Sequence, residues 1–235
     1  MAGWAAKRFW TEVAVIEQPG GFGLRLDARE VKTPAKAALL VPTRALATAI
    51  AAEWQAQQGV IDAATMPFTR SANSAIDKVA TQRAAVVDLI VAYGDADLIC
   101  YRAAGPERLA VRQAEAWDPL LAWVARIGAP LGWQTGVMHV PQLPQSLAAL
   151  RQRVEALGVF ELTAFHDLVA LSGSLVIGLA VLAEFRPVQA LWDLSRIDES
   201  WAVEVWGPDD EAAVAAAAKQ RDFSHAASFY SLSKG

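Results

Sequence analysis

The uncharged stretch from Leu168 to Ala183 constrains the fold of this chain more than any other feature. Its sixteen residues lie between Asp167 and Glu184. A helix that spans a membrane needs about 20 apolar residues, and the chain has neither a second long apolar run nor a basic flank beside this one. We therefore expect no membrane insertion, but a buried helix over residues 163–184 around which a helical domain is built.

Small residues are spaced four apart within this run. Ala170, Ser174 and Gly178 would lie on one face of a continuous helix, with Gly173 beside them. Side chains of this size would let the backbones of neighbouring helices approach closely. The sequence therefore predicts tight helix packing around this face.

The N-terminal part of the chain alternates with period two from Arg8 to Val41. Turn-forming residues at positions 18–21 separate two alternating runs, which is the pattern of a β-hairpin. The glycines here are not a dinucleotide-binding motif, because Leu26 occupies the sixth position of the fingerprint and no helix follows. The expected strands of this antiparallel sheet cover residues 9–16, 22–27, a short segment near Val31, and 39–41.

From Pro42 onward the apolar residues have helical spacing. Thr43 is a suitable N-cap, and Leu46, Ile50 and Trp54 follow on one face. We expect an α+β fold, with a small antiparallel β-containing domain at residues 1–62 that includes this helix, and a larger all-helical domain at residues 63–235. The later helices are expected at 68–79, 82–93, 107–117, from Asp118-Pro119 onward, 146–157, 163–184, 187–205 and 209–223, before a frayed C-terminus.

Charge and cysteine content exclude several classes of protein. The chain has 21 Lys and Arg against 25 Asp and Glu, and its basic residues are scattered. A nucleic-acid-binding protein would need a clustered basic surface, so we expect no nucleic acid partner. The single cysteine, Cys100, fits a reducing compartment, and the N-terminus lacks the apolar core of a signal peptide. We expect a cytoplasmic protein of bacterial type.

Motifs for catalysis or metal binding are incomplete in this sequence. The three histidines are far apart and outside any zinc motif: His139, His166 and His225. Ser172 and Ser174 fall within an apolar run rather than at a strand-to-helix turn. Asp95 and Asp97 alternate as in a Ca²⁺ loop but lack the other oxygen ligands, so we interpret them as turn caps. We expect no catalytic residue, no cofactor, no metal ion and no binding of ATP.

Tryptophan is frequent, with nine residues. Trp201 and Trp206 lie at the end of the predicted helix 187–205, and tryptophan is enriched at the centres of protein interfaces. This helix is therefore a candidate recognition face, although a solvated acidic face behind a core stripe has the same pattern. Helical spacing separates Asp198 and Glu199 from the residues expected to face the core, which are Leu191, Leu194, Ile197 and Trp201. The candidate partner-binding residues are Asp198, Glu199, Trp201 and Glu204.

Short motifs occur in a fixed order from one end of the chain to the other. They are Arg8-Phe9-Trp10, Gly20-Gly21, Leu26-Asp27, Lys32-Thr33-Pro34-Ala35-Lys36, Ala51-Ala52-Glu53-Trp54, Met66-Pro67-Phe68-Thr69-Arg70, Asn73 with Ala75-Ile76-Asp77, Tyr93-Gly94-Asp95, Asp97-Leu98-Ile99-Cys100-Tyr101-Arg102, Trp117-Asp118-Pro119-Leu120, Gly173-Ser174-Leu175 and Trp206-Gly207. In these motifs the chain resembles the assembly chaperones of the catalytic F1 sector of ATP synthase, which bind the free alpha subunit in mitochondria and in some bacteria. It departs from the family pattern at Ala28, Glu30 and Ser71, which concern turn geometry and local packing.

The resemblance implies a function without chemistry. The protein would bind the free alpha subunit of F1-ATPase and shield its apolar surface until the beta subunit covers it, because an exposed apolar surface invites aggregation. The resemblance also places the important acidic position of the family on Asp198, with Glu199 beside it. We expect the free protein to be a monomer in the bacterial cytoplasm, with eukaryotic relatives in the mitochondrial matrix.

An enzyme with a small-molecule site at the junction of the two domains is the alternative function. Pockets often form at such junctions, and a mixed polar set lies near the expected boundary: Arg70, Asn73, Asp77, Asp95 and Arg102. The same residues could be buttresses between the domains. The basic loop Lys32–Lys36 also has two interpretations: it could contact an acidic partner, or it could be an ordinary solvated loop.

Overall fold

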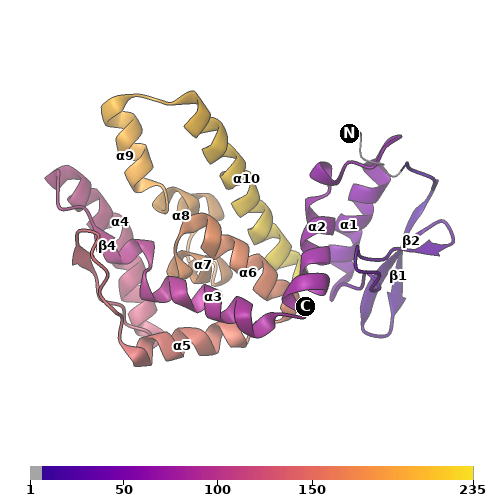
Figure 1. Cartoon of the computed structure of the whole chain (residues 1–235), viewed down its shortest axis with the longest axis horizontal. Helices are drawn as coiled ribbons and strands as arrows, with labels where there is room; N and C mark the ends of the chain where they lie inside the picture. Colours follow the sequence, from indigo (N-terminus) through magenta and orange to yellow (C-terminus); the bar gives the residue numbers. More distant parts are fainter. Residues whose placement is uncertain (1–6, 235) are drawn as a thin grey trace. The chain divides into compact units, whose positions relative to one another are not determined.

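The computed structural model describes residues 7–234 and has the expected α+β class (Figure 1). The chain divides into two compact units. Unit 1 contains the residues up to Arg83, Gly158–Ala164 and those from Ser228 onward, and unit 2 contains Ala84–Leu157 and Phe165–Ala227. Unit 1 extends past the expected boundary at residue 62 because Ala72 packs into its core. The domains 1–62 and 63–235 stay a prediction about which segments fold independently.

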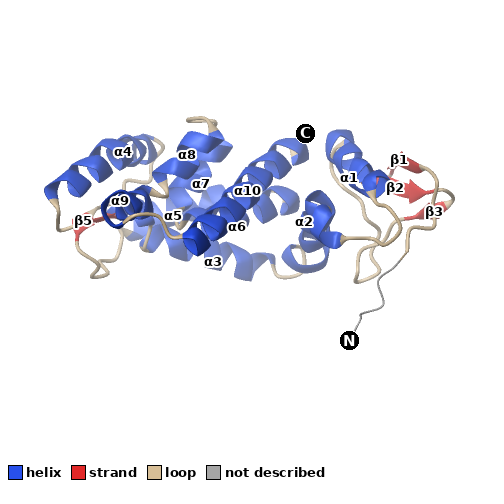
Figure 2. Ribbon diagram, turned by 90° about the horizontal axis from the view of Figure 1, so that it is seen from above, coloured by secondary structure: helices blue, strands red, loops and turns tan. Residues whose placement is uncertain are grey.

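Unit 1 is built on an antiparallel sheet of β1 (Val13–Gln18), β2 (Gly21–Leu26) and β3 (Arg29–Glu30) (Figure 2). The predicted hairpin between residues 9–16 and 22–27 is confirmed, because β1 and β2 pair antiparallel. Its first strand begins at Val13 rather than Phe9. The reason is that the Asp27 carboxylate accepts hydrogen bonds from the N–H groups of Thr11 and Glu12, at 3.1 and 2.9 Å, and so replaces the strand ladder there.

Helical segments complete unit 1: α1 (Arg44–Ala56), the 3₁₀ turn η1 (Ala63–Thr65), α2 (Pro67–Ser74) and the π-helical segment η2 (Ala75–Val79). Thr43 caps α1 as predicted, since its hydroxyl oxygen accepts a hydrogen bond from the Leu46 N–H at 3.1 Å. The buried core joins the sheet, these helices and two later segments of the chain: Trp10, Leu24, Leu26, Val31, Leu39, Val41, Leu46, Ala47, Ile50, Ala72, Ala164 and Phe229.

Glu53, on α1, holds the start of α2. Its carboxylate accepts hydrogen bonds from the Phe68 and Thr69 N–H groups, at 2.6 and 2.8 Å, and from the Thr69 hydroxyl at 2.7 Å. Burial raises the pKa of Glu53, and these hydrogen bonds act in the opposite direction.

Removing this carboxylate should destabilise the fold. We expect Glu53→Ala to lower the free energy of unfolding by about 2 kcal/mol, because N–H groups at a helix start lose their acceptor. Glu53→Gln keeps one acceptor oxygen, so its loss should be roughly half as large. Urea unfolding of both variants measures this, and equal losses would mean that the carboxylate has no special role.

Unit 2 is built from helical elements, of which α3, α6 and α10 share residues with unit 1. They are α3 (Arg83–Asp95), η3 (Leu98–Cys100), α4 (Glu107–Arg126), α5 (Pro144–Glu155), α6 (Val159–Ser172), α7 (Leu175–Leu182), α8 (Val188–Leu194), α9 (Ile197–Trp206) and α10 (Asp210–Ser233). Two short strands, β4 (Tyr101–Arg102) and β5 (Gln134–Thr135), pair in parallel. Within this unit α7 is central, with α4, α6 and α8 around it (Figure 1). None of the helices among residues 7–234 combines the length and the apolarity that a bilayer crossing requires.

The uncharged run is largely buried, as predicted, but it is not one helix. It is divided between the end of α6 and α7, because Gly173 adopts a φ of 71° and Ser174 then caps α7. The Ser174 hydroxyl oxygen accepts a hydrogen bond from the Ile177 N–H at 3.0 Å. The break removes Ala170 from the predicted small-residue face and leaves it exposed, whereas Gly178 lies at a close contact between helices.

The predicted restart of a helix at Asp118-Pro119 is wrong. Asp118 does not cap a new helix, because its carboxylate accepts a hydrogen bond from the Arg102 guanidinium at 2.8 Å. Pro119 therefore lies inside the continuous helix α4. Trp117 and Leu120, on either side of this position, are both fully buried, and this packing outweighs the missing proline N–H.

The C-terminal helices also differ from the prediction. The helix expected over 187–205 is divided into α8 and α9, where the Ser195 hydroxyl donates a hydrogen bond back to the Trp192 carbonyl at 2.7 Å. The end of the chain is expected to be frayed, but residues 224–233 are helical, because α10 continues to Ser233 and buries Phe229 in the core of unit 1. Because α8 and α9 are separate helices, residues of α8 and α9 cannot be assigned to one face by helical spacing.

Candidate functional site

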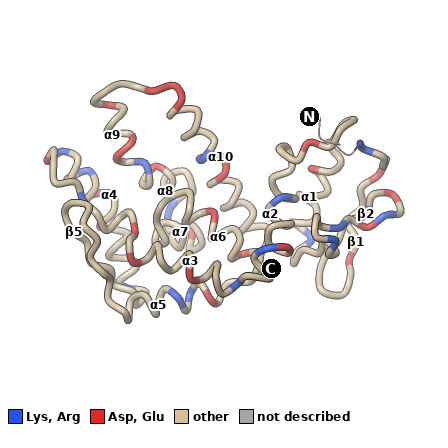
Figure 3. The backbone as a smooth tube through the Cα atoms, in the orientation of Figure 1, with Lys and Arg blue, Asp and Glu red and all other residues tan. Residues whose placement is uncertain are grey.

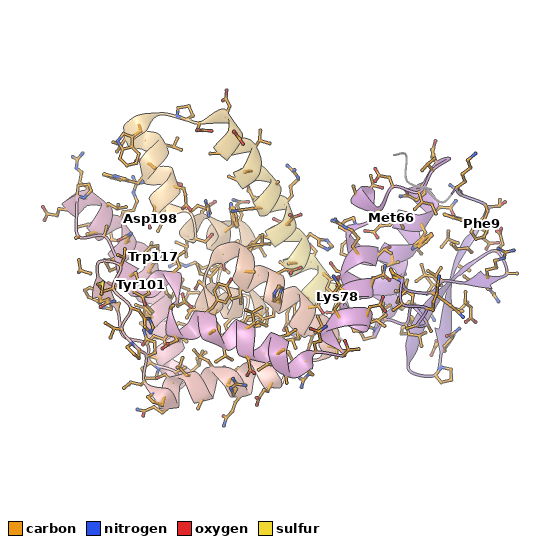
Figure 4. The ribbon with its side chains drawn as sticks, in the orientation of Figure 1. Phe9, Met66, Lys78, Tyr101, Trp117 and Asp198 are labelled. Carbon is orange, nitrogen blue, oxygen red and sulfur yellow. The ribbon has the colours of Figure 1, made fainter. Side chains whose placement is uncertain are left out.

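An open groove in unit 2 has a volume of about 640 Å³. Its apolar lining includes Leu98, Leu109 and Val137, and its polar lining includes Gln113 and Asp198. Figure 4 labels Asp198, Tyr101 and Trp117, which come from α9, β4 and α4 and lie in the same part of the unit. The groove therefore combines apolar walls with one exposed carboxylate of the predicted recognition helix.

Gln113, on α4, fixes the position of Asp198. Its amide group is buried, and its Nε2 donates a hydrogen bond to Oδ1 of Asp198 at 2.6 Å. Its Oε1 accepts a hydrogen bond from the Ala103 N–H at 2.7 Å, which determines the orientation of the amide. Sequence reasoning missed Gln113, because no local pattern marks a glutamine that pairs with a residue 85 positions later.

Arg102 supports the same wall of the groove. Its guanidinium donates hydrogen bonds to the Gln113 carbonyl at 2.6 Å and to the Asp118 carboxylate at 2.8 Å. It also lies 4.9 Å from the ring centre of Trp117 and 5.7 Å from that of Trp133. Burial lowers the pKa of Arg102, and Asp118 partly compensates. The Arg102 charge is thus matched within the protein and serves packing.

The other acids of α9 are paired with arginines. Glu199 lies 2.6 Å from Arg196, and Glu204 accepts two hydrogen bonds from Arg112, at 2.7 and 2.9 Å. This pairing lowers the pKa of Glu204 and raises that of Arg112. The Arg112 guanidinium also lies 5.3 Å from the Trp201 ring.

Asp198 differs from these acids in having a neutral partner. Among residues 7–234 no basic group lies within 4.0 Å of its carboxylate, which is exposed. The prediction that Trp201 would lie on the opposite side of the helix from Asp198 and Glu199 is wrong for Asp198. Asp198 bonds to Gln113 of α4, and the half-buried Trp201 ring lies beside Arg112 of the same helix. The roles of Glu199, Trp201 and Glu204 in partner binding stay predictions.

Three of the residues proposed for the alternative enzyme site, Asp77, Asp95 and Arg102, have separate structural contacts. Asp77, in unit 1, accepts hydrogen bonds from the Thr33 hydroxyl and the Ala35 N–H, at 2.6 and 3.0 Å, and so anchors the basic loop Lys32–Lys36. Asp95, in unit 2, accepts one from the Gln142 N–H at 2.8 Å. Arg70 and Asn73 belong to α2, and Arg102 has the partners described above.

The histidines His139 and His166 have local partners. His139 contacts Asp95 and Tyr101, and His166 contacts Asp167. Burial raises the pKa of the Cys100 thiol, which disfavours the reactive thiolate. In the part of the chain that the structure describes, no three metal-ligating side chains are grouped as a metal site.

Comparison with known proteins places the chain in a family. The family model for the ATP12 chaperone protein matches residues 7–125. The crystal structure of Atp12 from Paracoccus denitrificans is 48% identical, with a TM-score of 0.95 over 97% of this chain and 99% of that chain. An aspartate-to-lysine variant of the same protein has equal identity and TM-score, over 97% of this chain and 98% of that chain.

A eukaryotic protein is more distantly similar. The mitochondrial protein atp12 of Schizosaccharomyces pombe is 23% identical over 219 residues, which cover 88% of this chain and 75% of that protein. The chain therefore belongs to the ATP12 chaperone family, a non-enzymatic family of chaperones for F1-ATPase assembly.

Proposed function

We propose that this protein binds the free alpha subunit of F1-ATPase and shields the apolar surface that the beta subunit later covers. A single observation supports this proposal and the position of the contact. Asp198 is exposed at the edge of an apolar groove and has no basic partner within residues 7–234. A basic side chain of the alpha subunit would supply that partner.

The groove suits a transient protein contact. Apolar walls provide the affinity, and a charge at the edge selects the partner and its orientation. Asp198 is already held by Gln113, so little side-chain entropy is lost when it binds. The protein would act in the bacterial cytoplasm as a monomer, and Glu199, Trp201 and Glu204 would lie along the same contact.

Charge reversal at Asp198 tests this function. Asp198→Lys should weaken binding of the alpha subunit by several kcal/mol for a close pair, because attraction becomes repulsion. Asp198→Asn should do less harm. The measurement is the soluble fraction of the alpha subunit when it is co-expressed with each variant.

A control must separate binding from folding. Water can replace the Asp198 carboxylate at this exposed position, so Asp198→Lys should cost at most about 1 kcal/mol of stability in a circular dichroism melt. Asp222→Lys, which reverses an exposed charge on α10, is the matched control and should keep the alpha subunit soluble. Full rescue by Asp198→Lys would move the contact elsewhere, and an unfolded Asp198→Lys would make the residue structural.

A further inference from the structure

Most residues of helix α9 are at least partly exposed to solvent. Among its ten residues, all of which the structure describes, Ile197 alone is buried. A helix this short is marginal in water without a packed face. Its apolar side chains near the C-terminal end are instead exposed, with exposed fractions of 49% for Val203, 52% for Val205 and 81% for Trp206.

The first turns of α10 also expose an apolar side chain. Val214 is 72% exposed, and the alanines around it sustain the helix by intrinsic propensity rather than by packing. We call the end of α9, the start of α10 and the loop between them the α9–α10 corner; its exposed apolar residues are Val203, Val205, Trp206 and Val214. An apolar group that contains so exposed a tryptophan is typical of an interaction surface.

Three acidic residues lie between Trp206 and Val214 along the chain. Asp209, Asp210 and Glu211 lie in the loop and the first turn of α10 (Figure 3). Asp209 accepts a hydrogen bond from the Ala212 N–H at 2.8 Å, and within the described chain none of the three has an ion-pair partner. Unit 2 as a whole has 17 Asp and Glu against 10 Lys and Arg, so nothing in its net charge offsets them.

We propose that the α9–α10 corner is a second docking surface, which binds an apolar segment flanked by Lys or Arg on the alpha subunit. This inference rests on the proposed function, because it assigns the segment to the same partner. The charge of the corner decides the occupant. An anionic membrane surface would be repelled by the three acids, and a second copy of this chain, meeting corner to corner, would bring like charges together.

Removal of the apolar anchor is the first test. In co-purification with the alpha subunit, Trp206→Ser should reduce the amount bound about tenfold, as expected for an interface hot spot. Leu89→Ser, which removes an apolar side chain of 52% exposure on α3, is the matched control and should bind as the wild type does. The melting midpoints of both variants should stay near that of the wild type, because both side chains face solvent.

Charge and direct contact provide the second test. The double variant Asp210→Lys, Glu211→Lys should weaken binding and reduce its dependence on salt. A photo-crosslinking amino acid at position 206 should label an alpha-subunit segment that contains apolar and basic residues. A crosslink to another copy of this chain, or to lipid, would overturn the proposal.

The possible results distinguish a failure of the α9–α10 corner from a failure of the proposed function. Normal binding by Trp206→Ser together with loss of binding by Asp198→Lys would overturn the corner and leave the proposed function intact. Equal weakening by Leu89→Ser and Trp206→Ser would also overturn the corner, because the contact would then be non-specific. A wild-type protein that binds no alpha subunit would overturn both.

Discussion

Gly178→Leu should lower the free energy of unfolding by at least about 3 kcal/mol, because the site has no room for a side chain. A Cβ atom at Gly178 would lie 2.9 Å from Cε2 of Phe165 and 2.9 Å from Cγ2 of Val169. Both side chains belong to α6 and are fully buried, so neither can move toward solvent. The backbones of α6 and α7 would have to separate, which would open cavities in the centre of unit 2.

Two further variants calibrate this result. Gly178→Ala should be milder, because the helix propensity of alanine offsets about 1 kcal/mol of the clash. Gly132→Ala is the matched control, since a Cβ there would come no closer than 3.7 Å to the Gln142 side chain. Thermal and urea unfolding measure the series. A wild-type midpoint for Gly178→Leu would refute the close packing of α6 and α7.

The largest pH effect should come from Asp97, whose carboxyl group is completely buried. It accepts hydrogen bonds from the N–H groups of Ile99 at 3.3 Å and Val176 at 3.0 Å, and one from the Ser174 hydroxyl. It therefore joins η3 to the start of α7. Burial raises the pKa of Asp97 to about 6, against these hydrogen bonds.

The direction of the pH effect follows from this raised pKa. The folded protein holds the proton of Asp97 more tightly than the unfolded chain does, whose value is about 3.9. The contribution to stability is complete below about pH 4 and declines as the pH rises through 6, by roughly 3 kcal/mol in total. Asp97→Ala should abolish this decline.

Asp97→Ala should also destabilise the protein at pH 7, by about 2 to 5 kcal/mol, because buried N–H groups lose their acceptor. The stability gap between wild type and variant should widen by roughly 3 kcal/mol between pH 7 and pH 4. Urea unfolding at several pH values measures the gap, with Asp88→Ala as a control for loss of a surface carboxylate. A gap independent of pH would show that the buried carboxyl group titrates as it does in the unfolded chain.

Local interactions explain what the sequence alone determined. The hairpin follows from turn residues and alternation, α1 from the Thr43 cap and its apolar spacing, and the end of α9 from Gly207, which has a φ of 90°. The α+β class and the buried character of the run near α7 follow from the same short-range patterns, because each depends on residues a few positions apart. A helix that carries Asp198 could be expected from the same patterns, but the choice of Asp198 came from the family resemblance, and its role in partner binding stays a prediction.

Contacts between distant residues decided the rest. The break between α6 and α7 is stabilised by Asp97, which bonds to Val176, a residue 79 positions away. The contact that fixes Asp198 joins it to Gln113 across 85 positions, and Glu204 meets Arg112 across 92. No period or cap in the sequence encodes such pairs, because a hydrogen bond depends on distance in space, which only the packing of the helices sets.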